Sequence, residues 1–396
     1  MLKTTERNCA MIIKNAKVFT PEFKFENKEI GIKDSRFIEV QSLEPAQEKV
    51  IDAGGLYAIP GLIDIHFHGA VGHDFCDGTF EAIDALARFE ASHGVLAICP
   101  ATMTFSEDIL NNIMDAASSY CSKQKGILLH DGQNCADLVG INMEGPFISP
   151  NKVGAQNPKY LHAPDAEMFK RLQKRSSGLI KLVDIAPEED GAIEMIKECK
   201  NMARFSIAHT CASYEDAIDA FDAGASHMTH LYNAMPGITH RAPGPIVAAQ
   251  ERKAEVELIS DGVHSHPAVV AFTFRVFGAD RVILIADSMM ACGLEDGQYS
   301  LGGQAVTVNG SRAVLTEFPD TIAGSATDLF NCMRYAVLKA GVPLEDAVRA
   351  ATYNPAHSIK IDTDYGSIEP NKYANLLLVD KELNIKAIYN HGIKIA

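Results

Sequence analysis

The sequence lacks the features that would place the protein in a membrane or outside the cell. No apolar run approaches the length of about 18 residues that a membrane-spanning helix needs, and the opening MLKTTERNCAMII holds no apolar stretch long enough for a signal peptide. The nine cysteines are scattered, odd in number and never spaced as CxxC, which disfavours both a disulfide framework and a zinc ribbon. We therefore expect reduced thiols and a cytoplasmic protein.

An excess of positive charge is also missing. Lys and Arg number 36 against 51 Asp and Glu, which gives a net charge of -15. Such a chain is a poor partner for nucleic acid or an anionic membrane. An anionic small substrate stays open, because a few local cations can hold a phosphate.

The 396 residues, 47% of them hydrophobic, are too many for one small domain, and their texture changes along the chain. Short β-like runs broken by Asn, Asp, Pro and Gly occupy both ends, and we expect residues 1–57 and 356–396 to pair into one small β-sandwich. Between them, residues 58–355 alternate apolar β-like runs with helical patterns. The runs cover residues 57–69, 93–102, 137–146, 178–188, 204–213, 225–235, 255–264 and 281–289.

Eight such units predict an α/β fold with a parallel (β/α)₈ TIM-like barrel. A doubly wound open sheet is the alternative, but no GxGxxG follows the first run.

Metal-competent side chains collect where these predicted strands end, which is where barrel enzymes carry their chemistry. They are His66, His68, Glu144, His209, His230 and Asp287. His66 and His68 are two apart and share one face of a strand. Several histidines and a carboxylate on one rim are the ligand type of zinc or a similar divalent ion. We expect His227, three residues before His230, to face the opposite side and to be structural.

Several motifs in one order resemble the N-acetylglucosamine-6-phosphate deacetylases of the amidohydrolase superfamily. They are PGLIDIHFHG, MEGPF, THLYNAM, HRAPG, DGVH, ADSMMACG and IAGSATDL, together with the His209 strand. The resemblance implies hydrolysis of an N-acetyl amide to acetate and glucosamine 6-phosphate. It implies Glu144, His209 and His230 as the principal metal ligands, and Asp287 as the catalytic acid/base. His66 and His68 match a pair that binds a second ion in some members, so one or two ions are expected, Zn²⁺ first and Fe²⁺, Co²⁺ or Mn²⁺ as alternatives.

The resemblance extends to substrate positions and to assembly. Asn233 and Ala234 match a clamp on the sugar phosphate, and His264 matches a sugar-binding histidine. Arg241 matches a phosphate-binding arginine that can reach the neighbouring subunit's site, which implies a homodimer or a higher homo-oligomer. Two further sets match a flap over the substrate and a loop at its acetyl end: Ala155 and Gln156, then Ile322, Ala323 and Gly324. Gln156 departs from members that carry histidine there.

Three other readings stay open at this point. A dihydroorotase- or hydantoinase-like amidase would favour a rim lysine on the fourth strand, where the chain reads DIAPE and where Lys181 falls well before the strand end. A deacetylase for N-acetylgalactosamine 6-phosphate differs only in the sugar epimer. A metal-holding barrel without catalysis would have no use for Asp287 beside the metal.

Overall fold

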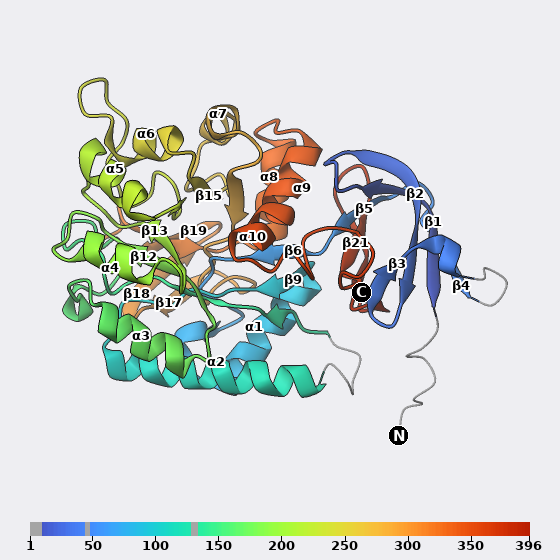
Figure 1. Cartoon of the computed structure of the whole chain (residues 1–396), viewed down its shortest axis with the longest axis horizontal. Coiled ribbons are helices and arrows are strands. Elements are labelled where there is room, and N and C mark those ends of the chain that lie inside the picture. The colour runs from blue at the N-terminus through green and yellow to red at the C-terminus, as the bar shows by residue number, and fades with distance from the viewer. Residues whose placement is uncertain (1–9, 44–47, 128–133) are drawn as a thin grey trace.

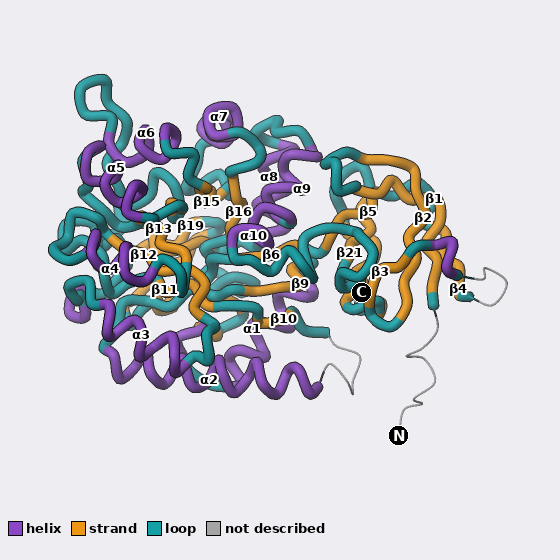
Figure 2. The backbone as a smooth tube through the Cα atoms, viewed as in Figure 1, coloured by secondary structure: helices purple, strands orange, loops and turns teal. Residues whose placement is uncertain are grey.

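In the computed structural model, residues 10–43, 48–127 and 134–396 are described. They form a large part in which helices surround strands and a smaller part built mainly of strands, which lie side by side in Figure 1 and are coloured by secondary structure in Figure 2. None of the helices within these ranges is both long enough and apolar enough to cross a membrane.

The large part is a barrel of parallel strands, and each of the eight predicted runs contributes to it within the described residues. The strands are β6 (Leu62–Asp64), β9 (Val95–Ile98), β10 (Asp137–Leu138) with β11 (Ile141–Met143), β12 (Ile180–Ile185), β13 (Arg204–Ile207), β14 (His227–Met228), β15 (Glu255–Ile259) and β16 (Val282–Ile285). A parallel bridge between Ala101 and Asn142 links the β6–β9–β10 group to the β11–β16 group. The circle closes where the Asp287 amide donates to the His66 carbonyl over 2.9 Å. The predicted barrel is confirmed, and the open doubly wound sheet is excluded.

Helices lie around the strands. They are α1 (Phe80–Ser92), α2 (Glu107–Ile127), α3 (Ala166–Arg175), α4 (Ala192–Cys199), α5 (Tyr214–Ala223), α6 (Gly244–Glu251), α7 (Pro267–Phe277), α8 (Leu329–Leu338), α9 (Leu344–Ala351) and α10 (Tyr353–Ser358). Their starts follow ordinary capping chemistry: the Thr79 side chain accepts from the Ala82 amide, and Ser213 with Asp216 forms a capping box.

The strands separate two cores because successive side chains point to opposite faces. In β15, Val256 and Leu258 pack outward into the large core shared with the helices, whereas Ile259 packs inside the barrel with Ile63 and Ile285. The inside of the barrel is therefore apolar in part, and polar side chains gather where the strands end.

The two ends of the chain share one sheet, as predicted. Its strands are β1 (Met11–Phe19), β2 (Phe25–Lys33), β3 (Arg36–Ile38), β4 (Lys49–Asp52), β5 (Tyr57–Pro60), β21 (Leu376–Val379), β22 (Ile385–Asn390) and β23 (Ile393–Lys394). Strand β5 pairs with β1 and, from the other end of the sequence, with β21. The run 57–69 is thus two strands, since the chain passes at Gly61 from this sheet into β6 of the barrel.

A second small sheet, which the sequence patterns did not predict, follows β16. It contains β17 (Gly297–Leu301), β18 (Gln304–Asn309), β19 (Arg312–Leu315) and β20 (Ile322–Ser325), and a short hairpin of β7 (Gly69–Ala70) and β8 (His73–Asp74) follows the end of β6. Gly302 and Gly303, with φ of 57° and 80°, form the tight turn between β17 and β18. Positive φ at both turn residues is what a two-residue hairpin of this kind requires.

Candidate metal centre and active site

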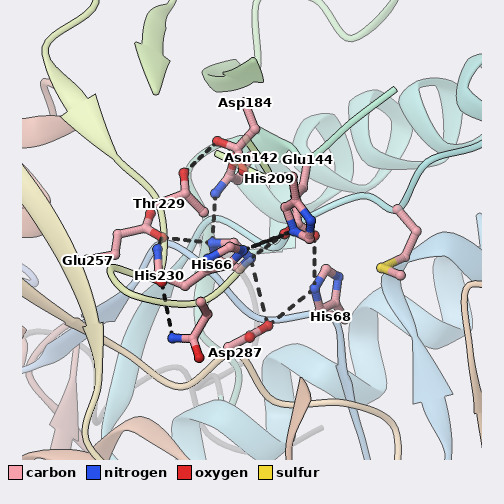
Figure 3. A network of polar contacts seen from close by, with 12 residues as sticks. His66, His68, Asn142, Glu144, Asp184, His209, Thr229, His230, Glu257 and Asp287 are labelled. Atoms are coloured by element: carbon pink, nitrogen blue, oxygen red, sulfur yellow. Dashed lines mark hydrogen bonds and ion pairs between the residues drawn. The ribbon is translucent and has the colours of Figure 1, made fainter. Parts of the chain in front are cut away.

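The predicted rim residues meet in a cavity of about 830 Å³ at the C-terminal ends of the barrel strands. Strand-end side chains form its floor, and its walls come from the segment 151–158 and from the inserted sheet β17–β20. Figure 3 shows the side chains of the floor pointing toward one another from separate strands.

Glu144, His209 and His230 form the tighter of two candidate metal groups. Glu144 Oε1 lies 3.0 Å from His209 Nε2 and 3.1 Å from His230 Nε2, and the two Nε2 atoms are 3.1 Å apart. Ligands about 2.0–2.1 Å from a tetrahedral zinc ion lie about 3.3 Å from one another. His209 Nδ1 bonds the Lys152 carbonyl at 2.8 Å, which leaves the Nε2 lone pair for a cation. The donor set and its spacing therefore fit a divalent ion.

His66, His68 and Asp287 form the second group, and their ligand atoms all lie within 4.8 Å of one another. Asp287 Oδ1 is 3.3 Å from His68 Nε2 and 3.8 Å from His66 Nε2. Glu144 joins the groups, because its Oε2 atom is 3.2 Å from His68 Nε2. His66 Nε2 is fully buried without a hydrogen-bond partner among the described residues, as expected of an atom that is directed at a cation.

The buried carboxyls and imidazoles of the site change one another's pKa. Burial alone would raise the pKa of both rim carboxyls, but hydrogen bonds from His209 and His230 hold the pKa of Glu144 well below its usual range, and His68 lowers the pKa of Asp287. Burial alone would lower the pKa of His68, but its contacts with Asp287 and Glu144 raise it to about 10. Two carboxyls with lowered pKa thus face His66 and His68, whose imidazole pKa values are raised, and a divalent cation would take the place of the protons on those two rings.

The backbone turns sharply where these side chains leave their strands. His209, His230 and Asp287 have φ of 43°, 27° and 48°, which is the left-handed region that residues with a Cβ seldom adopt. Each lies two residues beyond the last residue of its strand. The turn directs the side chain toward the barrel axis, which period-2 geometry alone would not ensure.

A shell of buried polar groups beneath the floor was missed by the sequence patterns. Glu257 Oε2 lies 2.8 Å from His66 Nδ1 and accepts from the His230 amide at 3.1 Å. Asp184 Oδ1 accepts from the Thr229 hydroxyl at 2.8 Å (Figure 3). The available signal was a carboxylate between apolar neighbours within a strand, in EVELI for Glu257 and in IKLVDI for Asp184.

The expectation that His227 faces away from His230 was wrong. His227 also points into the barrel, where its Nδ1 atom lies 2.9 Å from Ser206 Oγ and its Nε2 atom lies 4.0 Å from Glu257 Oε1. Strand β14 ends at Met228, so the two-residue period does not reach His230. The contacts of His227 agree with a structural role.

The flap residues Ala155 and Gln156 line the cavity. The Gln156 amide nitrogen donates to Glu144 Oε2 at 2.6 Å, and its oxygen accepts from the Thr104 amide, also at 2.6 Å. Gln304 of β18 donates to the Ala155 carbonyl at 2.6 Å. Gln156 is thereby tied to a candidate metal ligand, and the flap is tied to the inserted sheet.

The other proposed substrate positions divide into those that line the cavity and those that do not. Asn233, Ala234, His264, Ile322 and Gly324 line it. His264 Nδ1 lies 2.7 Å from Asp261 Oδ2, so its Nε2 atom is available to a ligand.

Ala323 is buried behind the cavity wall, in the core of the inserted sheet. The expected loop at residues 322–324 is instead the strand β20.

Arg241 does not line this cavity. It is exposed in the segment 236–243 that leads into α6. Lys181, the other cation weighed from the sequence, is the second residue of β12 and thus lies at the strand end opposite the site.

Comparisons with known proteins agree with this geometry. The profile of the amidohydrolase family matches residues 57–393. A Bacillus subtilis protein named N-acetylglucosamine-6-phosphate deacetylase is 35% identical, with 95% of this chain and 94% of that protein covered. An Escherichia coli protein named N-acetylgalactosamine-6-phosphate deacetylase is 29% identical, with 96% and 98% covered. The solved structure of an N-acetyl-D-glucosamine-6-phosphate deacetylase mutant from Mycobacterium smegmatis, in complex with N-acetyl-D-glucosamine-6-phosphate, superimposes with a TM-score of 0.86 at 29% identity, covering 98% of this chain and 99% of that one.

Proposed function

The chain belongs to the amidohydrolase family, and from that premise we propose that it hydrolyses the N-acetyl amide of N-acetylglucosamine 6-phosphate to glucosamine 6-phosphate and acetate. The observation that carries the proposal is the meeting of Glu144, His209 and His230 with Asp287 in one cavity. The names of the B. subtilis and M. smegmatis relatives support the choice of substrate.

Glu144, His209 and His230 would hold the tightly bound ion. Their one oxygen and two imidazole nitrogens suit Zn²⁺, and they also accept Fe²⁺, Co²⁺ or Mn²⁺. His66 and His68, with Asp287, would hold a second ion, and Glu144 supports this because one carboxylate contacts both groups. A bound divalent ion lowers the pKa of water from 15.7 to about 7 and polarises a carbonyl oxygen.

Asp287 is the residue that would move the proton. The lowered pKa of its carboxyl keeps it ionised and able to take a proton from the attacking water. The same carboxyl then gives that proton to the departing amine. An amide is hard to hydrolyse without this step, because an unprotonated amine is a poor leaving group. Asp287 sits on the cavity floor beside His68, so water and amide would both be within its reach.

The remaining cavity residues would bind the sugar phosphate. His264 and Asn233 offer polar atoms to its hydroxyl and phosphate oxygens, and Ala155 and Gln156 would cover it. Gln156 replaces the histidine of some family members, and its carboxamide is already engaged by Glu144 and Thr104. In this chain the polarisation of the amide carbonyl would therefore fall to a second ion or to His264.

Arg241 would bind the phosphate of a substrate held in the cavity of a neighbouring copy of the chain. We therefore propose a homodimer. The residue lies outside the cavity of its own chain, although a guanidinium matches phosphate oxygens well. Ile238 of the same segment and Phe272 of α7 are 49% and 47% exposed, and both line one mainly apolar hollow beside Tyr232. Exposed apolar side chains of this kind are typical of subunit interfaces.

A second substrate, N-acetylgalactosamine 6-phosphate, is supported by the E. coli relative at 29% identity. Acetate release from metal-loaded protein should be measured on both sugar phosphates and on unphosphorylated N-acetylglucosamine. The proposal expects the gluco epimer to have the highest kcat/KM and the unphosphorylated sugar the lowest. A higher kcat/KM for the galacto epimer would reverse the assignment, and no acetate from either phosphate would refute it.

We also propose a cytoplasmic location. Seven cysteines of the described ranges are free thiols, which suits a reducing compartment: Cys76, Cys99, Cys121, Cys199, Cys211, Cys292 and Cys332.

A further inference from the structure

Glu257 lies directly beneath both candidate metal groups and belongs to neither. It is fully buried in β15 and points into the barrel, where the next residue of the same strand face, Ile259, is apolar. An ionised carboxylate is costly to bury unless it is paired. The partners of Glu257 are therefore informative about what the carboxylate does there.

One oxygen of Glu257 serves two metal-directed residues. Oε2 lies 2.8 Å from His66 Nδ1 and accepts from the backbone amide of His230 at 3.1 Å. Asn142 Nδ2 also lies 3.3 Å from His66 Nδ1, but the contact with Glu257 is the shorter one. A neutral His66 ring that donates its Nδ1 hydrogen to Glu257 carries its lone pair on Nε2. That atom faces the site, 3.6 Å from Glu144 Oε1 and 3.8 Å from Asp287 Oδ1.

His66 differs in this respect from the other histidines of the floor. His209 is oriented by a neutral group, the carbonyl of Lys152. The Nδ1 atoms of His68 and His230 have no hydrogen-bond partner among the described residues. Of the four histidines in the two candidate metal groups, His66 is therefore the one whose far nitrogen contacts a carboxylate. A carboxylate behind an imidazole fixes the tautomer and makes the ring a stronger ligand.

We propose that Glu257 is the positioning residue that makes the His66–His68 group a metal site, and that it couples this site to the first through its bond to His230. This inference rests on the proposed two-ion centre. The ligands of this group are two imidazoles and one carboxylate, Asp287. The negative charge of Glu257, on the far side of the His66 ring, makes that ring a stronger metal ligand. Replacing Glu257 therefore weakens the second ion more than the first.

The structure separates the charge of Glu257 from its hydrogen bonds. The second oxygen, Oε1, has no hydrogen-bond partner among the described residues and lies 4.0 Å from His227 Nε2. In Glu257→Gln the amide nitrogen can occupy the position of Oε1, while the carboxamide oxygen occupies that of Oε2 and keeps both of its hydrogen bonds. This variant therefore loses only the charge. Glu257→Met removes the bonds as well. Asp184→Asn is the matched control, since Asp184 is equally buried and bonds Thr229 rather than a histidine.

The experiment titrates Zn²⁺ and Co²⁺ into metal-free protein with a competing chelator, and elemental analysis gives the number of bound ions. Glu257→Gln should weaken the second site by at least about tenfold and change the first by less than about threefold. Glu257→Met should weaken both sites, and Asp184→Asn should leave both within about threefold of the parent. The melting temperature of each ion-free variant checks that the fold persists.

Two results would overturn the proposal: a Glu257→Gln protein that binds both ions as the parent does, or one that loses both ions equally. Binding of a single equivalent by the parent protein would overturn it as well. The titration needs no sugar, whereas the proposed function is tested by acetate release. A selective loss of the second ion in a protein that releases no acetate would therefore refute the function and leave the role of Glu257 standing.

Discussion

Replacing Arg241 by alanine should weaken the binding of the phosphorylated sugar alone. The side chain is exposed, does not line the cavity of its own chain, and forms no ion pair with any described residue, so few interactions within the chain are lost with it. A hydrogen bond to a charged group contributes about 1.5–3 kcal/mol, and a tenfold change in binding corresponds to about 1.4 kcal/mol. The expected rise in KM is therefore about 10- to 150-fold, with kcat little changed.

The measurement compares two substrates and two proteins. Initial rates of acetate release give KM for N-acetylglucosamine 6-phosphate in the parent and in Arg241→Ala, and unphosphorylated N-acetylglucosamine is the internal control. The poor activity on the unphosphorylated sugar should be the same in both proteins. If the substitution lowers the activity on both substrates equally, Arg241 stabilises the fold or the rim and does not bind the phosphate.

A subunit-mixing assay tests whether the arginine acts across an interface. Arg241→Ala keeps Asp287, and Asp287→Asn keeps Arg241, so a mixed dimer holds one site with both residues. Random reassociation of a two-fold dimer makes about half of the dimers mixed, and about one quarter of all sites are then complete. At substrate concentrations below KM the mixture should therefore regain up to about a quarter of the parent rate, which neither variant approaches alone. A mixture no faster than the average of its components would refute binding in trans.

Other changes address the centre and its walls. Glu144→Gln should lose most of its metal on dialysis, because it removes the anionic ligand 3.0 Å from His209, and a fully loaded, active variant would contradict that assignment. Since the pKa of ion-free His68 is raised to about 10, cation binding should release protons and tighten as the pH rises toward that value, which calorimetry in buffers of different ionisation enthalpy can measure. Gln304→Ala should raise KM by about fivefold, or about 1 kcal/mol, with metal content unchanged, since it frees the carbonyl of Ala155; an unaltered KM would argue against a role of this contact in closing the flap.

The fold followed from sequence periodicity to a large extent. The helical patterns between the apolar runs include TFEAIDALARFEAS, which forms α1 (Phe80–Ser92), and SYEDAIDAFDAG, which forms α5 (Tyr214–Ala223). Both combine a cap with an apolar face. The sheet β17–β20 was not predicted, although GG and NG in GQYSLGGQAVTVNGSRAVL are hairpin signals. These strands lie outside the alternation of strand and helix that predicts the barrel, so the barrel pattern does not include them.

The metal-ligating part of the candidate site could be predicted from the sequence. His66, His68 and Glu144 stand out because they are polar side chains at the ends of apolar strands, where barrel enzymes carry their active-site residues. Glu257 was not found, since a carboxylate in the middle of EVELI acquires a partner only when β15 lies beside the ends of β6 and β14. Contacts between strands distant in sequence carry no local signal, so the shell behind the ligands becomes visible only in the folded chain.

The backbone conformation at the strand ends also depends on contacts between segments that are distant in the sequence. His209, His230 and Asp287 adopt left-handed backbone conformations, each of which costs about 1–3 kcal/mol for a residue with a Cβ. Glycine would relieve the strain at every one of these positions, but it would remove the ligand or the base. The surrounding fold must therefore hold the three turns in place. Among the hydrogen bonds that do so are those from the Asp287 amide to the His66 carbonyl and from the His230 amide to Glu257. Two of the three strained residues are thus held through contacts with His66 or with the carboxylate beneath it. The interactions that close the barrel and those that shape the candidate metal centre are in part the same, which is why a single buried carboxylate can affect both.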